Sequence, residues 1–140
     1  MKKHYVITAA AVILPLALGW GCRKKGEGME DFSAALNMQY ESYQIIKDNR
    51  EDPARAGKLF TEYYKKNRDA MAAAFKRYYR KYGDGSRLTK EETDFLDSEM
   101  RKVNALLSDR DIRKVMDHPA FIEEAREGSV ILTEVREGAK

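Results

Sequence analysis

Residues 53–82 read PARAGKLFTEYYKKNRDAMAAAFKRYYRKY, a segment in which large apolar side chains recur every three or four positions. That spacing places them on one face of an α-helix. The stripe consists of Phe60, Tyr64, Met71, Phe75, Tyr78 and Tyr82, with Asn67 or Arg68 at the position where one more apolar residue is expected. The segment therefore predicts one long amphipathic helix.

Both ends of this predicted helix carry the residues that usually begin and end helices. Asp52 can accept hydrogen bonds from the first exposed amides, and Pro53 suits the first helical position, where a missing N–H costs nothing. Gly83 and Gly85 follow the last apolar residue, and glycine readily takes the left-handed turn after a helix. The helix is therefore expected to span residues 53–82.

Helical spacing continues on both sides of this segment. Residues 29–49 carry one apolar stripe, and a third helix is expected over residues 89–107, where Thr89 and Glu92 are spaced as a capping box. A shorter pair follows, separated at His118-Pro119 and closed by Gly128. The stripes are Phe32, Leu36, Tyr40, Tyr43 and Ile46; Leu96, Met100, Val103 and Leu107; Ile112, Val115 and Met116; and Phe121, Ile122 and Ala125.

These helices and their short loops predict an all-α fold, an antiparallel bundle of four to five helices over residues 29–128. Residues 129–135 are β-branched and apolar, but a single strand would have nothing to pair with. We therefore expect residues 129–140 to form an irregular tail.

The N-terminus has the features of a secretory signal. Four residues with two lysines precede an apolar run at residues 5–20, which Pro15 interrupts. As a helix this run would measure about 24 Å, shorter than the roughly 30 Å hydrocarbon core of a bilayer. Gly19, Trp20 and Gly21 then lead into Cys22, the only cysteine of the chain.

This exit resembles the lipobox of bacterial lipoproteins, in which a leucine-like residue and two small residues precede a cysteine. Gly21 fits the position before the cysteine, and Leu18 lies one place earlier than the usual leucine. The resemblance implies that residues 1–21 are removed and that Cys22 becomes the acylated first residue of the mature protein. It implies a membrane partner and a location in the bacterial cell envelope, facing the periplasm or the surface.

Two other interpretations of the N-terminus remain open. The apolar run could be an uncleaved, short membrane anchor, or an ordinary signal that leaves Cys22 as a free thiol, which is a liability in an oxidising compartment. In each case residues 22–28 form a linker in which three basic residues and two glycines give a flexible, hydrophilic spacer.

Lys76, Arg77, Arg80 and Lys81 alternate with tyrosines and form a candidate anion-binding face. Residues 53–82 hold nine basic and two acidic side chains, whereas residues 29–52 hold six acidic and two basic ones. The structural alternative, which we favour, is that the two helices are neighbours and pair their charges. Tyr78 and Tyr82 lie on the apolar stripe, which favours a place in the core over stacking on a ligand. The export signal argues against nucleic acid as a partner.

Composition argues against most catalytic and metal-binding classes. The 140 residues include 26 basic and 23 acidic side chains, for a net charge of +3, but only one cysteine and two histidines. A haem- or metal-carrying bundle is an alternative that would depend on His118, which capping of the helix after it also explains. No catalytic or phosphate-binding motif is present. We therefore expect no enzyme activity, cofactor or metal, and a structural or accessory role in binding an envelope protein not identified by the sequence.

Overall fold

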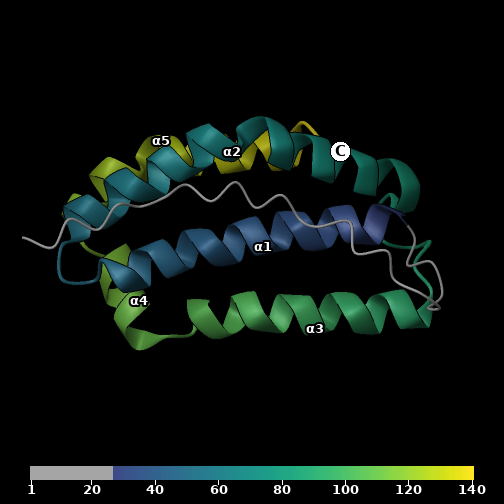
Figure 1. Cartoon of the computed structure of the whole chain (residues 1–140), viewed down its shortest axis with the longest axis horizontal. Helices are drawn as coiled ribbons and strands as arrows, with labels where there is room; N and C mark the ends of the chain where they lie inside the picture. The colour runs from purple at the N-terminus through teal and green to yellow at the C-terminus, as the bar shows by residue number, and fades with distance from the viewer. Residues whose placement is uncertain (1–26) are drawn as a thin grey trace, which may run out of the picture.

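The computed structural model describes residues 27–140 as five α-helices, with side chains described from Met29 onward (Figure 1). They are α1 Glu27–Asp48, α2 Pro53–Tyr82, α3 Lys90–Leu107, α4 Arg110–Met116 and α5 Pro119–Glu137. The prediction of an all-α bundle is confirmed. Over residues 27–140, no helix is both long enough and apolar enough to cross a membrane. The predicted signal and Cys22 lie outside the described residues.

The predicted caps set the limits of the helices. Asp52 accepts a hydrogen bond of 3.0 Å from the Arg55 amide at the start of α2, and Gly83, at φ +59°, donates its amide to the Tyr79 carbonyl at the end. Thr89 and Glu92 form the complete capping box of α3. His118 Nδ1 accepts a hydrogen bond from the Ala120 amide, which confirms the prediction that this histidine begins a helix.

The predicted boundaries are wrong at two places. Helix α1 begins at Glu27, so the last two residues of the predicted linker 22–28 are helical. The predicted irregular tail 129–140 is helical through Glu137, because Ile131 and Val135 are buried in the core and hold the last turns of α5 in place. Gly128 therefore lies inside α5 instead of ending a helix.

Helix α2 is the centre of the molecule and packs along both α1 and α5. Helix α3 packs on α1, and the short α4 carries the chain from the end of α3 to the start of α5 (Figure 1). Successive long helices alternate in direction, as an antiparallel bundle requires. However, the neighbours α1 and α3 run in the same direction, as do α2 and α5. In the described part of the chain α3 and α5 do not contact each other, so the bundle is open between them.

Two glycines and a threonine bring α2 and α5 close together. A Cβ atom on Gly57 would lie 2.8 Å from the Phe121 carbonyl oxygen, and one on Gly128 would lie 2.9 Å from Thr61 Cα. The Thr61 hydroxyl donates to the Glu124 carbonyl at 2.7 Å and accepts from the Gly128 amide at 3.3 Å. The absence of side chains at these glycines is what permits the close approach.

All of the predicted stripe of α2 is buried, and its first four members belong to the main core cluster. A second cluster at the end of the bundle combines Met29, Tyr78, Tyr82 and Leu96. The described members of both clusters lie within residues 29–139. The predicted apolar stripes of α3 and α5 are partly wrong, because two of their members are not buried. Met100 is 43% exposed and Ile122 is 52% exposed.

Candidate functional site

The predicted anion-binding residues Lys76, Arg77, Arg80 and Lys81 lie on the last turns of α2, and all four are exposed. The tyrosines between them divide into two groups. Tyr78 and Tyr82 are buried in the second core cluster, whereas Tyr79 is only half-buried. The prediction that Tyr78 and Tyr82 belong to the core is confirmed, so neither ring is free to stack on a ligand.

Two of the four cations have partners inside the molecule. The Arg77 guanidinium donates two hydrogen bonds of 2.8 Å to the Asp31 carboxylate of α1. Lys81 Nζ lies 5.2 Å from the centre of the Tyr82 ring, a cation–π contact. Arg77 therefore helps to join α1 to α2, and the charge pairing that we favoured accounts for this one residue of the four.

Lys76 and Arg80 form no ion pair with any described residue, and they continue a longer row of cations. Helical spacing places them on the side of α2 opposite its core stripe, where Glu62 and Asp69 are the acidic residues. We call the exposed cations on this side that form no ion pair in the described range the α2 basic face. It consists of Arg55, Lys58, Lys66, Lys76 and Arg80.

The remaining ion pairs of α2 go to α5. Lys65 Nζ lies 2.7 Å from a Glu127 carboxylate oxygen, and the Arg68 guanidinium lies 3.0 Å from Glu134. Sequence reasoning expected acidic partners on α1 and missed those on α5. Glu134 was missed because residues 129–140 were placed outside the bundle, and Glu127 because the contact of α5 with α2 was not predicted. Pairs this exposed contribute about 0–1 kcal/mol each, so they align the helices more than they stabilise them.

Helix α1 and helix α2 also share a buried polar contact. The Ser42 hydroxyl and the Tyr64 hydroxyl are 2.9 Å apart, and both residues are fully buried. Burial raises the pKa of Tyr64 above its ordinary value, so this phenol stays neutral at physiological pH. Among the described residues every buried side-chain nitrogen or oxygen has a hydrogen-bond partner. The pair is therefore a structural contact within the core.

A second tyrosine contact lies at the start of α3. The Tyr82 hydroxyl donates to the Glu92 carboxylate at 2.8 Å, and the Thr89 amide donates to the same carboxylate at 2.9 Å. Burial and the Glu92 carboxylate raise the pKa of Tyr82 to about 12. The bonds from Thr89 and Tyr82 lower the pKa of Glu92. These groups hold the end of α2 against the beginning of α3.

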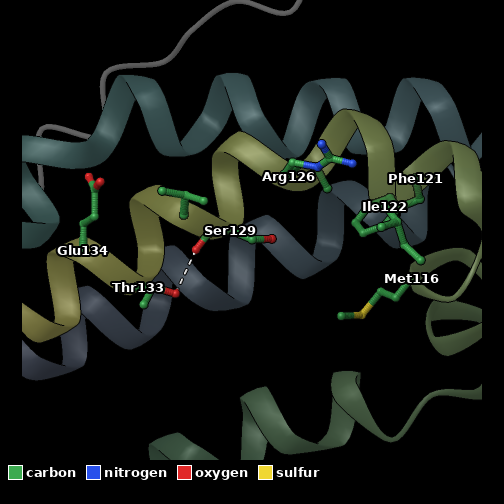
Figure 2. Close-up of a pocket in the computed structure, with 9 residues that line it drawn as sticks. Met116, Phe121, Ile122, Arg126, Ser129, Thr133 and Glu134 are labelled. Atoms are coloured by element: carbon green, nitrogen blue, oxygen red, sulfur yellow. Dashed lines mark hydrogen bonds between the residues drawn. The ribbon is translucent and has the colours of Figure 1, made fainter.

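An apolar groove of about 530 Å³ runs along the outer side of α5. Figure 2 shows Met116, Phe121 and Ile122 gathered at one end of the groove and Glu134 at the other. Val130, 49% exposed, also lines it. The sequence signal for this groove is that apolar residues of α4 and α5 exceed what one buried stripe can hold. Such a surface can bind an apolar segment of a partner.

A smaller hollow of about 240 Å³ lies where α3 and α5 face each other across α1. Leu36 and Tyr43 of α1, Met100 of α3 and Leu132 of α5 are among the residues that line it. The hollow follows from the missing contact between α3 and α5, which leaves Met100 partly exposed beside α1. Its lining is mixed, since Gln39, Asn104 and Arg136 add polar groups to the apolar side chains.

The described residues offer little to a metal or haem. No group of three or more His, Cys, Asp or Glu side chains in residues 27–140 could hold a metal ion. His118 is exposed and caps α5, and Met29 and Met71 are packed in the core. Comparison of the chain with protein-family models, curated proteins and solved structures finds no match. The function must be argued from the residues of the chain itself.

Proposed function

We propose that the chain is a lipid-anchored component of the bacterial cell envelope, held in the membrane by acylated Cys22. The observation that carries this proposal is the lipobox-like exit at residues 18–22, followed after only four residues by helix α1. So short a connection keeps a folded helical body beside the membrane. Each buried methylene of an acyl chain contributes about 0.8 kcal/mol, so two or more chains make the anchor effectively permanent.

The helical body acts by binding, as a structural or accessory component. The groove along α5 supports this role, because Ile122 and Val130 are about half exposed although both are apolar. An envelope protein that covers this groove is the partner we propose.

The anchor is tested by expressing the full chain in a bacterial host, wild type beside Cys22→Ser. We expect the wild type to have the mass of residues 22–140 plus acyl chains and to sediment with membranes. The variant should lose the acyl chains and the cleavage together. An unmodified mature protein in the soluble fraction would overturn the proposal, and an unprocessed chain in the membrane would favour the short-anchor interpretation.

A second candidate function is an anion-binding module. The observation that favours it is that Lys76 and Arg80 are exposed and form no ion pair within residues 27–140. Retention on an acidic matrix that falls with salt is the expected behaviour, because screening weakens exposed charge pairs. Neutralising Lys76, Arg77, Arg80 and Lys81 together should then abolish retention while the helix content measured by circular dichroism stays unchanged.

A further inference from the structure

The α2 basic face extends along almost the whole of α2. Its first and last members, Arg55 and Arg80, are 25 residues apart, which corresponds to about 38 Å along the helix axis. All of its side chains are exposed, and none forms an ion pair within the described range. It is therefore a long, narrow row of five cations, none of them held in an ion pair within residues 27–140, with Glu62 and Asp69 as the acidic residues on the same side.

The charge of the body is strongly divided between this helix and the rest. Helix α2 holds nine basic and two acidic residues, whereas the other residues of 27–140 hold twelve basic and twenty-one acidic ones. A body with this division has one positive side and a negative remainder. An anionic surface attracts the positive α2 side and repels the negative remainder of the body. Such a surface therefore orients the whole body.

The N-terminus of the body emerges beside the end of this positive side. Asp31 is bonded to Arg77, and the ring centres of Phe32 and Tyr78 are 4.2 Å apart, so the first turns of α1 pack on the last turns of α2 (Figure 1). Cys22 precedes Glu27 by five residues, which reach at most about 18 Å when extended. An anchor at Cys22 therefore lies within reach of the plane that touches the α2 basic face.

From these observations we infer that the α2 basic face lies on the anionic headgroup surface of the membrane that Cys22 enters. The inference rests on the proposed anchor and adds a second point of attachment and a fixed orientation. Lipid headgroups move sideways within the bilayer, so cations spread over a straight helix can each meet a phosphate without a matching fixed spacing. Nucleic acid is a poorer fit, since Tyr78 and Tyr82 are buried and supply no stacking surface.

The test measures binding of residues 27–140 to vesicles without any acyl anchor, once circular dichroism and cooperative urea unfolding show that this part of the chain folds by itself. The vesicles consist of phosphatidylcholine alone, or of phosphatidylcholine and phosphatidylglycerol in equal parts. We expect sedimentation with the anionic vesicles only, and loss of binding as salt rises from about 0.15 M to about 1 M, because the Debye length falls from about 8 Å to about 3 Å.

Two triple variants with the same change of charge identify the surface. One is Lys66→Gln/Lys76→Gln/Arg80→Gln on α2, and the other is Arg101→Gln/Arg110→Gln/Arg126→Gln on the other helices, where these arginines are also exposed. Each basic residue near an anionic surface strengthens binding about fivefold, so the α2 variant should bind roughly a hundredfold more weakly. The other triple variant should bind nearly as well as the wild type.

Several results would overturn the inference. Equal weakening by the two triple variants would show that net charge alone governs binding. Binding to heparin or DNA without binding to anionic vesicles would assign the face to a soluble polyanion. Circular dichroism must show that the triple variants keep the helix content of the wild type. The variant Lys66→Arg/Lys76→Arg keeps the charge and should therefore keep the binding.

The full acylated chain provides a second measurement. Reconstituted in anionic vesicles, it should show slower amine modification of Lys66 and Lys76 than in phosphatidylcholine vesicles, with no change at exposed Lys114 of α4. Equal rates in the two lipids would overturn the orientation while leaving the anchor intact. Conversely, vesicle binding by residues 27–140 would stand even if Cys22 proved not to be acylated, so the two proposals fail separately.

Discussion

The buried contact between Ser42 and Tyr64 ties α1 to α2 through a single pair of hydroxyls. Ser42 also donates to the Gln39 carbonyl at 2.7 Å, whereas Tyr64 has no other hydrogen-bond partner among the described residues. The two hydroxyls are therefore not equivalent, because removing Ser42 leaves a buried phenol without a partner and removing Tyr64 leaves Ser42 still bonded.

We predict that Ser42→Ala lowers the free energy of unfolding by about 1–3 kcal/mol, and that Tyr64→Phe lowers it by about 0.5–1.5 kcal/mol. The double variant should lose less free energy of unfolding than the sum of the two single losses. It contains neither hydroxyl, so no buried hydroxyl is left without a partner. Urea unfolding measures all three. Exposed Ser98→Ala is the control, expected within about 0.5 kcal/mol of the wild type, and a cost for Ser42→Ala no larger than this control would contradict the prediction.

Glu92 gives the start of α3 a dependence on pH. Because its folded-state pKa is lowered by the bonds from Thr89 and Tyr82, its contribution to stability is complete above the ordinary glutamate pKa of about 4.3. That contribution is lost as pH falls through the lower folded-state value. Glu92→Gln keeps a capping-box residue but removes the titration.

We therefore predict that the difference in unfolding free energy between wild type and Glu92→Gln shrinks when pH is lowered from about 7 to about 3. Urea unfolding at both pH values gives this difference. Glu123→Gln serves as the control, since this exposed carboxylate of α5 forms no hydrogen bond or ion pair within residues 27–140. A difference for Glu92→Gln that does not change with pH would contradict the prediction.

At the scale of helices, the contact of α2 with α5 depends on Gly57 and Gly128. If helix propensity alone governed position 128, alanine would stabilise α5 by about 1 kcal/mol. A Cβ atom there would instead lie 2.9 Å from Thr61 Cα and 3.0 Å from a ring carbon of Phe60, closer than van der Waals contact allows. The steric and the propensity effects thus have opposite signs.

We predict that the steric effect dominates and that Gly128→Ala lowers the free energy of unfolding by about 1–3 kcal/mol. Ala70→Gly on the exposed side of α2 gives the propensity difference without any close contact and should cost about 1 kcal/mol. A Gly128→Ala variant more stable than the wild type in urea would show that the helices are not as close as described.

At the scale of the whole molecule, α3 is the least supported long helix. It packs along its length only on α1, touching the end of α2 near its start and the short α4 near its end. Its buried side chains are Leu96, Val103 and Leu106. Helix α2, by contrast, packs against two neighbours, α1 and α5, and buries ten of its residues. Segments with few buried contacts open at lower free energy than the rest of a protein.

We predict that amides in the middle of α3 exchange their hydrogens at a lower opening free energy than those in the middle of α2. Native-state hydrogen exchange in low concentrations of denaturant measures both. Amides of α1, which lies between the two, provide the internal comparison. A single opening free energy shared by α2 and α3 would show that the body unfolds as one unit.

Much of this architecture could be predicted from the sequence, because the signals for helices are local. Asp52, Thr89 and His118 cap helices through atoms only two or three residues away, and the stripe of α2 needs only the helical period. Gly128 misled the prediction for the same reason. Locally it looks like the end of a helix, but its role is set by Thr61, which is 67 residues away in the chain.

The candidate site divides in the same way. The number and spacing of the cations on α2 are properties of the sequence, but which of them stay unpaired depends on which helices become neighbours. Asp31 reaches Arg77 because α1 packs on α2, and Glu134 reaches Arg68 because α5 does. The exposure of Met100 likewise follows from the missing contact between α3 and α5. Helix positions are fixed by interactions within a few residues, whereas neighbours and free surfaces are chosen by long-range packing, which only the tertiary structure contains.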